Sequence, residues 1–448
     1  MIFFTFLLSP FNRKLREGIV GRFNSLKHLK MFKSSTFKKK YWFHVASHGE
    51  FQQIETIIDS IKEDSNDVGI IVSFFSPSGF NNVNSQNIDC KIYLPFDFPI
   101  TILKALKIVN PEKIFFTSND LWPNFIFFAK LKKIELILSS ARVHEEVNFS
   151  LEIKNFYQRI FIESFSKIFT ISKHDYDSIS KNVSSSKIFN VGNPRFDRIV
   201  KNANLSFIRY KNHKIVLERD KMDDVQHWFK NELKIKRKNM ILILASLWNE
   251  DNQILFPEVF EFLQKDDSRK IVIVPHEISN KTISDYISII EKTSFSFKVI
   301  DTLCNIFDLK ERVIIVNKVG FLSTLYSQTH IAYVGGGFSK NGVHNLTEPA
   351  ASRNPVIFGP NYNNSNRQDA VSLINTSPRD SIYTKLIAES REGVVSITSA
   401  GYTINNSYEF KKVLDDLCIP ENHNSSSAQA RNHVWRNLGA TERIMEIL

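Results

Sequence analysis

Short apolar stretches recur along the chain, separated by longer segments in which apolar residues return every three or four positions. The short stretches are rich in β-branched and aromatic residues, which favour strands, and the longer segments have the period of amphipathic helices. Such alternation predicts βαβ units and therefore a parallel sheet. In the first half, the predicted strands span residues 42–45, 70–75, 114–116, 134–138, 168–171 and 188–191.

A second alternating series follows a polar, charged segment, residues 202–238, that shows no strand pattern. Its predicted strands span residues 240–244, 271–274, 297–300, 313–316, 331–334 and 356–358. Residues 422–428 are rich in Asn and Ser, which predicts a loop, and a last helix is expected to end at Leu448.

The length of the chain agrees with two separate cores. A chain of 448 residues is long for one core, and 42% hydrophobic with 23% charged residues is typical of a folded protein. We therefore predict an α/β protein with two lobes. The expected divisions are an N-terminal segment (1–40), a first lobe (41–203), a linker (204–238), a second lobe (239–420) and a C-terminal loop and helix (421–448).

Positive charge is concentrated at the N-terminus. The chain has 58 Lys and Arg against 47 Asp and Glu, which suits an anionic partner such as a phospholipid surface, a phosphorylated substrate or nucleic acid. Residues 1–8 are apolar, too few to span a bilayer, and basic residues follow. This pattern predicts a membrane-surface segment; a frayed basic terminus is the alternative. The basic residues are Arg13, Lys14, Arg16, Arg22, Lys27, Lys30, Lys33, Lys38, Lys39 and Lys40.

The three cysteines, Cys90, Cys304 and Cys418, lie far apart and outside any CxxC pattern. This spacing indicates neither a disulfide framework nor a zinc site. We therefore expect a reducing, cytoplasmic location.

Two segments of the first lobe carry candidate chemistry. The stretch HVASHGE enters a helix directly after a strand, so Glu50 lies where site residues of open α/β sheets are found. A carboxylate there can act as a general base towards a sugar hydroxyl, although a Glu in a first helical turn is also ordinary. After the next strand, residues 75–79 (FSPSG) predict a loop of backbone donors or, equally, a plain turn.

The second lobe contains a glycine cluster, GGGFSKNGVHNLTEPA (335–350), directly after a predicted strand. Glycines allow close backbone approach, and a helix expected to begin near His344 or Asn345 would direct free N–H groups at an anion such as a phosphate. Glu348 could accept hydrogen bonds from ribose hydroxyls. The alternatives are a tight glycine turn with a capped helix and a surface carboxylate. The cluster matches neither GxxxxGK[ST] nor GxGxxG.

Two motifs of other sugar-transferring enzymes are weak or missing. The D-x-D formed by Asp175 and Asp177 falls early in a predicted helix, and we interpret it as a solvated helix face, not a metal clamp. A Glu-x7-Glu pair is absent because Val356 stands eight residues after Glu348. Its absence argues against nucleotide-diphosphate sugars as donors.

Nine motifs in the same order resemble those of the 3-deoxy-D-manno-octulosonic acid (Kdo) transferases that extend lipid A. They read HVASHGE, FFSPSG, YLPFDFP, NDLWPN, SSAR, GNPRFD, VPHEI, GG followed by HNLTEPAA, and FGPNY. The resemblance implies a GT-B fold, with two Rossmann-like lobes whose parallel sheets face a cleft. It also implies inverting transfer of Kdo from CMP-Kdo to the lipid A precursor lipid IVA in lipopolysaccharide core biosynthesis, without metal or cofactor. The enzyme would work at the cytoplasmic face of the inner membrane.

Carried over residue by residue, the resemblance makes Glu50 the catalytic base and Asp120 and Arg195 the charged stabilisers of the transition state. Asp120 and Arg195 stand where Glu and Lys are commoner, and His276 stands where many members have Arg. The first lobe is expected to bind the acceptor through Ser47, Gly49, Ser76, Ser78 and Gly79. The second lobe is expected to bind CMP through Pro275, His276, Val319, Gly320, Phe321, Gly336, Gly337, Asn345, Leu346, Thr347 and Glu348.

Two other functions stay open at this point. One is a GT-B transferase that uses another nucleotide sugar and a lipid acceptor. The other is a non-catalytic basic protein that binds a membrane or nucleic acid. The net charge of +11 favours such an anionic partner. No RNA-binding motif accompanies that charge, and we expect no nucleic-acid partner.

Overall fold

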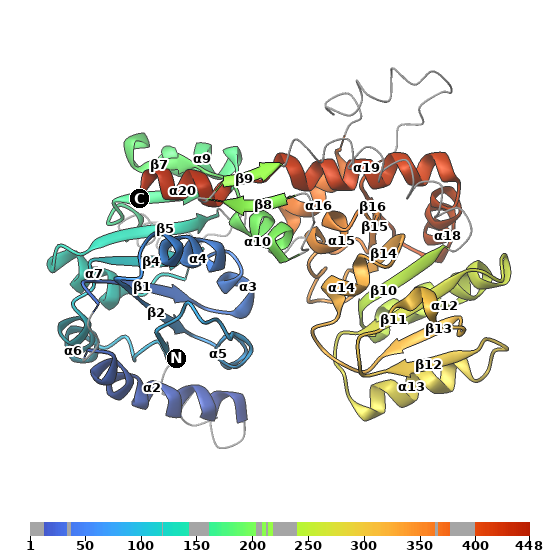
Figure 1. The fold of residues 1–448 in the computed structure, drawn as a ribbon, viewed down its shortest axis with the longest axis horizontal. Helices are drawn as coiled ribbons and strands as arrows, with labels where there is room; N and C mark the ends of the chain where they lie inside the picture. Colours follow the sequence, from blue (N-terminus) through green and yellow to red (C-terminus); the bar gives the residue numbers. More distant parts are fainter. Residues whose placement is uncertain are drawn as a thin grey trace, which may run out of the picture. The chain divides into compact units, whose positions relative to one another are not determined.

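A computed structural model describes residues 13–33, 37–118, 120–142, 161–202, 208–211, 214–217, 240–362, 366–376 and 399–448 (Figure 1). These residues form two compact lobes. The N-terminal lobe extends to Lys201 and also includes β8 (Ile208–Lys211) and the C-terminal residues Asn437–Leu448. The C-terminal lobe ends at Arg436.

A seven-stranded parallel sheet organises the N-terminal lobe, in the order β3-β2-β1-β4-β5-β6-β7. The chain builds outward from β1 to β3, then returns to the other side of β1 with β4. The carboxyl ends of β1 and β4 are therefore neighbours at a switch point, where open α/β sheets bind ligands. The strands are β1 (Lys39–Val45), β2 (Val68–Phe74), β3 (Cys90–Tyr93), β4 (Lys113–Thr117), β5 (Glu135–Ala141), β6 (Lys167–Thr170) and β7 (Ile188–Asn190).

The C-terminal lobe repeats this plan in a second seven-stranded parallel sheet, in the order β12-β13-β11-β10-β14-β15-β16. Its switch point lies between β10 and β14. The strands are β10 (Ile241–Leu247), β11 (Lys270–Pro275), β12 (Phe297–Ile300), β13 (Val313–Val316), β14 (Ile331–Val334), β15 (Val356–Phe358) and β16 (Gly401–Thr403). The α/β, GT-B-type architecture predicted from the sequence is confirmed.

Both faces of the N-terminal sheet are buried, which explains the near-continuous apolar character of its strands. Trp42 belongs to the core under one face and its neighbour Phe43 to the core under the other. Helices α2 (Arg13–Lys33), α6 (Pro99–Val109), α7 (Pro123–Leu131) and α9 (Lys173–Ser180) cover the first face. Helices α3 (His48–Phe51), α4 (Glu55–Asp64) and α20 (Ala440–Ile447) cover the second.

The C-terminal sheet is covered in the same way. Side chains of Leu242 and Leu244 pack under α12 (Asn249–Gln264), α13 (Asn280–Ile290) and α18 (Ser407–Leu417). Ile243 and Ala245 face the opposite core, which includes α14 (Leu322–Tyr326).

Helix α2 is built into the N-terminal lobe by one of its faces. Leu29 and Phe32 are buried in the sheet core, and the Ser25 hydroxyl donates to the Tyr93 carbonyl oxygen at 2.6 Å. Among the helices that the structure describes, none combines the length and the apolar character needed to cross a bilayer. Residues 1–12, which contain the apolar run, lie outside the described residues.

Two sequence expectations were wrong. Residues 422–428 belong to helix α19 (Pro420–Arg436), not to a loop, because His423, Ser426 and Ala430 recur at helical spacing and are buried. The segment 204–238 is not free of strands, because β8 and β9 (Lys214–Leu217) form a two-stranded sheet within it. Its other residues lie outside those described.

The C-terminal helix is joined to the N-terminal lobe through a buried carboxylate. Asp197, on α10 (Pro194–Asn202), accepts hydrogen bonds from the backbone N–H groups of Gly439 and Thr441, both at 2.7 Å. The Thr441 hydroxyl also lies 2.7 Å from that of Thr56 on α4. These contacts fix both α20 and α10, and α10 carries Arg195.

We predict that Asp197→Ala lowers the free energy of unfolding by about 3 kcal/mol, because two buried N–H groups lose their acceptor. The measurement is urea-induced unfolding followed by circular dichroism. Asp177→Ala is the matched control, since Asp177 is exposed on α9 and its loss should change stability by less than about 0.5 kcal/mol. Equal effects of the two substitutions would contradict the prediction.

Candidate active site

The N-terminal lobe gathers charged side chains at the switch point of its sheet. Glu50 follows β1 and Asp120 follows β4, so the neighbouring ends of two parallel strands bring them together. Their charges interact, as do those of Glu50 and Arg142. Arg142 comes directly after β5, the next strand of the sheet. The structure thus unites two predicted catalytic residues with an arginine to which the sequence assigned no role.

Glu50 is held by the turn that precedes it. Ser47 caps the short helix α3, its hydroxyl accepting from the Glu50 N–H at 3.4 Å. In return, one carboxylate oxygen of Glu50 accepts from the Ala46 N–H at 2.5 Å. This reciprocal arrangement fixes the direction of the carboxylate.

Burial raises the pKa of Glu50 to about 7. The Ala46 hydrogen bond acts against burial and lowers the pKa, the negative charge of Asp120 raises it, and the positive charge of Arg142 lowers it. A carboxyl group with a pKa near neutrality can both take up and release a proton at physiological pH, which suits general acid–base chemistry.

The residues predicted to bind the acceptor also meet here. The Ser76 hydroxyl accepts from the Gly79 N–H at 3.3 Å and lies 3.0 Å from the Ser78 hydroxyl, at the start of α5 (Pro77–Asn82). A Cβ on Gly79 would lie only 3.1 Å from the Ser47 carbonyl carbon. Gly79 therefore allows α5 to pack directly against the turn that carries Gly49 and Glu50.

Two arginines approach this site from other elements. A Cβ on Gly49 would lie 3.8 Å from a guanidinium nitrogen of Arg195, so α10 brings Arg195 next to the Glu50 turn. Arg22, on α2, donates to the Phe75 carbonyl oxygen at 2.7 Å and lies over the Phe75 ring. Burial lowers the pKa of Arg22, while the charges of Tyr93 and Asp120 raise it.

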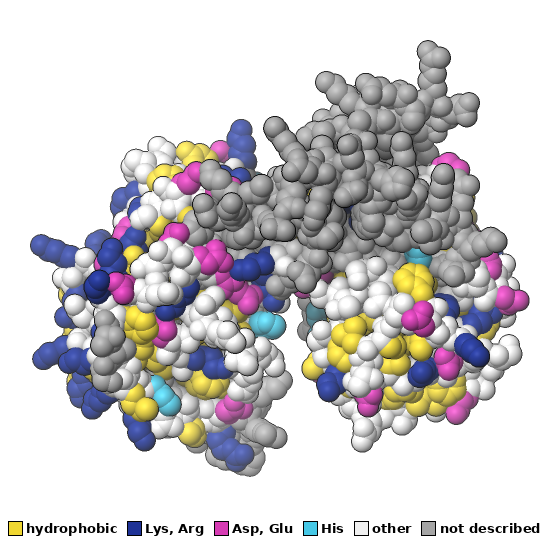
Figure 2. Space-filling view, viewed as in Figure 1, with side chains coloured by type: hydrophobic (Ala, Val, Ile, Leu, Met, Phe, Trp, Pro, Cys, Tyr) yellow, Lys and Arg dark blue, Asp and Glu magenta, His cyan; other side chains and the backbone are white. Residues whose placement is uncertain are grey.

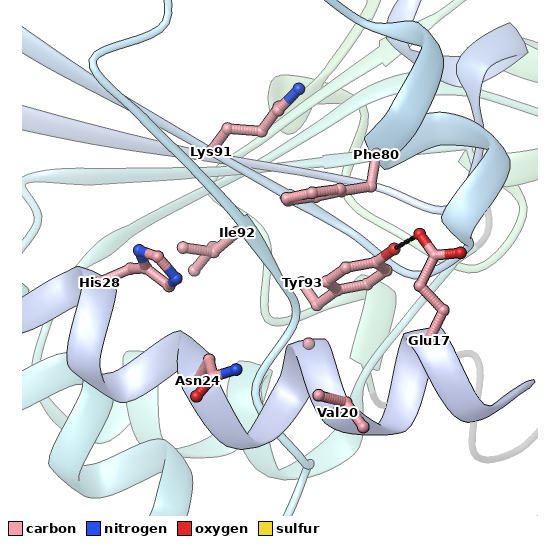
Figure 3. Close-up of a pocket in the computed structure, with 9 residues that line it drawn as sticks. Glu17, Val20, Asn24, His28, Phe80, Lys91, Ile92 and Tyr93 are labelled. Carbon is pink, nitrogen blue, oxygen red and sulfur yellow. Dashed lines mark hydrogen bonds between the residues drawn. The ribbon is translucent and has the colours of Figure 1, made fainter.

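An open cavity of about 240 Å³ lies between α2, α5 and β3 (Figure 3). Tyr93 stacks on Phe80 with ring centroids 4.3 Å apart, and its hydroxyl donates to Glu17 at 3.1 Å. None of the sequence-predicted site residues is among the side chains that line it. The cavity lies where α2 packs against α5 and β3, and it shares no lining residue with the Glu50 site.

In the C-terminal lobe, the glycine cluster packs against its own lobe. A Cβ on Gly335 would lie 2.3 Å from the Ser246 carbonyl oxygen, and one on Gly337 would lie 2.5 Å from the Gly359 Cα. Gly336 has a φ of 94°, in the left-handed region. Packing against their own lobe therefore accounts for these glycines. That Gly336 and Gly337 contact the donor substrate stays a prediction.

A buried aspartate to which the sequence analysis gave no role lies at this switch point. Asp251, on α12, accepts from the Trp248 N–H at 2.9 Å, the Gly336 N–H at 3.0 Å and the Tyr333 hydroxyl at 2.7 Å. Burial raises the pKa of Asp251, and these three hydrogen bonds lower it. The carboxylate joins the end of β10 to the glycine cluster after β14.

His276 lies in a stack of three aromatic rings. Its ring is parallel to that of Trp248, with centroids 4.4 Å apart, and to that of His344, at 4.2 Å. The Trp248 indole N–H donates to His344 Nε2 at 3.0 Å. Burial and the charge of His276 lower the pKa of His344 to about 4, and burial lowers the pKa of His276.

The remaining predicted CMP-binding residues lie at neighbouring strand ends. Pro275 ends β11, and Val319, Gly320 and Phe321 follow β13, where Gly320 has a φ of 91° and open space around it. Helix α15 (Thr347–Ala351) begins at Thr347, not at His344 or Asn345 as expected. The Asn345 side chain accepts from the Thr347 N–H at 3.0 Å, so it caps the helix from outside.

The interpretation of the D-x-D motif as a solvated helix face was wrong for its first residue. Asp175 is buried, and the Ser172 hydroxyl accepts from its N–H at 3.1 Å and donates to its carboxylate at 2.5 Å. Asp177 is exposed. The two carboxylates therefore differ in environment. Within the described ranges, no three His, Cys, Asp or Glu side chains are grouped to hold a metal ion.

Comparison with known proteins gives this geometry a context. A family model described as 3-deoxy-D-manno-octulosonic-acid transferase (kdotransferase) matches residues 19–198. A 3-deoxy-D-manno-octulosonic acid transferase of Aquifex aeolicus is 26% identical over 330 residues, 72% of this chain and 76% of the relative. One from Rickettsia bellii is 23% identical over 415 residues, 91% of this chain and 85% of the relative.

Solved structures show the same fold. A UDP-GlcNAc 2-epimerase from Neisseria meningitidis has a TM-score of 0.54 at 12% identity, covering 91% of this chain and 99% of the other. A glycosyltransferase from Rickettsia africae has a TM-score of 0.52 at 14% identity, covering 92% and 97%. At such identities the likeness concerns the fold alone.

The packing of the glycine cluster leads to a stability prediction. We expect Gly337→Ala to lower the free energy of unfolding by about 3 kcal/mol. The added methyl group would overlap backbone atoms of Gly359, which cannot move away as a flexible side chain could. Gly320→Ala is the control: it meets no neighbour within 4 Å and should cost only about 1 kcal/mol for its positive φ. Thermal unfolding of the two variants measures the difference, and an equal loss would show that the cluster is loosely packed.

Proposed function

Because this chain belongs to the 3-deoxy-D-manno-octulosonic acid (Kdo) transferase family and is a glycosyltransferase, we propose that it transfers Kdo from CMP-Kdo to the lipid A precursor lipid IVA. The reaction inverts the anomeric centre and needs no metal or other cofactor. The observation that carries the proposal is the Glu50 carboxyl, placed at the switch point with Asp120 and Arg142 and with a pKa near 7.

In the proposed reaction, Glu50 takes the proton of an acceptor hydroxyl as its oxygen attacks the anomeric carbon of Kdo. The carbon–oxygen bond to the phosphate breaks, and CMP leaves with the electron pair. CMP is a good leaving group, so positioning and charge stabilisation supply most of the catalysis. Asp120 and Arg195 stabilise the charges that develop, while Ser47, Gly49, Ser76, Ser78 and Gly79 orient the acceptor.

The donor is assigned to the C-terminal lobe. There, Pro275 ends β11, His276 follows it, and the turn of Val319 to Phe321 follows the neighbouring strand β13. Gly336 and Gly337 follow β14, on the other side of β10. Asn345, Leu346, Thr347 and Glu348 complete the proposed CMP site at the start of α15.

Incubation with CMP-Kdo and tetraacylated lipid A precursor tests the assignment directly. If a folded preparation releases no CMP, the assignment is overturned. If UDP but not CMP stabilises the protein against thermal unfolding, another nucleotide sugar is favoured as the donor substrate.

The acceptor is a membrane lipid, and the N-terminal lobe has a surface suited to a membrane. Helices α2, α6 and α7 cover the same face of the sheet and pack side by side. Only one acidic residue, Glu17, occurs in the three. We call their outer surface the apolar–basic face. It exposes Phe23, Met31, Ile100, Leu103, Phe127 and Leu131, together with Lys27, Lys30, Lys33, Lys104, Lys107 and Lys130.

Apolar side chains that enter the lipid boundary, surrounded by lysines that attract anionic headgroups, are typical of peripheral membrane proteins. In Figure 2, Lys and Arg side chains gather along the left edge of the N-terminal lobe, where Figure 1 places α6 and α7. We therefore propose that this face holds the enzyme on the cytoplasmic side of the inner membrane, near its lipid acceptor.

We predict that kcat/KM rises with pH up to about 7 and then levels off, because the base is active only when the Glu50 carboxyl has lost its proton. Glu50→Gln should reduce kcat by roughly 10²- to 10⁴-fold. Glu63→Gln, an exposed position on α4, is the matched control and should keep the wild-type rate. Activity of Glu50→Gln within a fewfold of wild type would exclude Glu50 as the base.

We also predict that Phe23→Ser with Ile100→Ser weakens binding to vesicles containing phosphatidylglycerol by about tenfold or more, because each apolar side chain contributes more than about 1 kcal/mol when buried. Sedimentation with vesicles measures the change. Ile419→Ser is the control, since Ile419 is exposed in the C-terminal lobe. Vesicles of phosphatidylcholine alone should bind the wild type weakly. If the double variant and the control bind alike, the apolar–basic face is not the membrane contact.

A further inference from the structure

A buried histidine lies behind Asp120. His44, near the end of β1, has no exposed surface, and its Nε2 lies 2.9 Å from a carboxylate oxygen of Asp120. Its Nδ1 lies 2.9 Å from the Ser73 hydroxyl and 3.1 Å from the Ser73 carbonyl oxygen, on the adjacent strand β2. The imidazole thus bridges a fixed strand and a partly exposed carboxylate.

The partners define which atoms carry hydrogen. An ionised carboxylate only accepts, so His44 Nε2 donates to Asp120. The Ser73 hydroxyl accepts from the Trp42 indole N–H at 2.9 Å, and its one hydrogen has two acceptors in reach, His44 Nδ1 at 2.9 Å and the Phe43 carbonyl oxygen at 3.4 Å. With the shorter of these bonds formed, the donors run from Trp42 through Ser73 and His44 to Asp120. If Nδ1 also carries a hydrogen, it donates to the Ser73 carbonyl oxygen, and Nε2 still donates to Asp120.

Packing keeps the ring in this orientation. The rings of Phe116 and Trp122 meet the imidazole edge to face, with centroids 5.9 and 6.2 Å away. The Asp120 side chain, by contrast, is 25% exposed, and an exposed carboxylate is free to change rotamer unless a partner holds it. Asp120 also interacts electrostatically with Glu50, so its orientation affects the proposed base.

We propose that His44 is a positioning residue, whose Nε2–H holds the Asp120 carboxylate in the direction that the transfer reaction requires. This inference rests on the proposed function of Asp120. His44 contacts neither substrate in this role and acts only through the carboxylate. Its loss should therefore lower kcat and leave the KM for CMP-Kdo unchanged.

A matched pair of substitutions tests the geometry. The amide nitrogen of Gln reaches the place of Nε2, whereas that of Asn reaches only the place of Nδ1. His44→Gln keeps the donor to Asp120 and should retain kcat within about threefold. His44→Asn should lose roughly 10- to 100-fold, the range seen when partners that orient metal-ligating side chains are removed. Equal losses in the two variants, or a rise in KM for CMP-Kdo that accounts for the loss, would overturn the proposal.

A double-mutant cycle separates positioning from a general loss of stability. If His44 acts through Asp120, His44→Asn should cause almost no further loss of kcat in an Asp120→Asn background. His330→Asn is the control for losing a buried histidine, since His330 is buried in the other lobe and accepts from the Ile241 N–H. Independent, additive losses would overturn the proposal. Wild-type enzyme that releases no CMP would instead overturn the proposed function itself.

Discussion

Parallel strands with both faces covered are the constraint on which this structure depends. Because side chains on both faces of each sheet are buried, polar chemistry is confined to the strand ends. The carboxyl ends at a switch point are the place where two neighbouring loops part and leave room for a ligand. Both lobes follow this constraint: Glu50 and Asp120 lie at the β1/β4 switch point, and Asp251 and Gly336 lie at the β10/β14 switch point.

The same constraint explains how much of the fold could be predicted. Strands buried on both faces read as apolar runs, and twelve of the fourteen strands in the two large sheets were found. The two that were missed, β3 and β16, are edge strands without an apolar run: Lys91 interrupts β3, and β16 is Gly401-Tyr402-Thr403. Helix α19 was missed for another reason: its Asn and Ser residues favour a loop locally, but burial of His423, Ser426 and Ala430 against the lobe overrides that preference.

The position of the candidate site was predictable where a residue stands at a strand end. Glu50, Ser76 and Gly79 follow this rule, and the structure brings them together. His44, Arg142 and Asp251 also lie at or next to strand ends, but no local motif singles them out, because their partners are distant in the sequence. His44 and Asp120 are 76 positions apart, and Asp251 and Gly336 are 85 apart. A local pattern contains no information about such pairs.

The hydrogen bonds of Asp251 affect how the proposed donor site can work. Its carboxylate already uses the Gly336 N–H, so this group is not available to a phosphate. Burial raises the pKa of Asp251, and its hydrogen bonds to Trp248, Tyr333 and Gly336 hold the carboxyl group inside the lobe. His276 brings no permanent charge either, because burial lowers its pKa. In the proposed function, donor recognition therefore depends on hydrogen bonds and shape more than on a fixed cation.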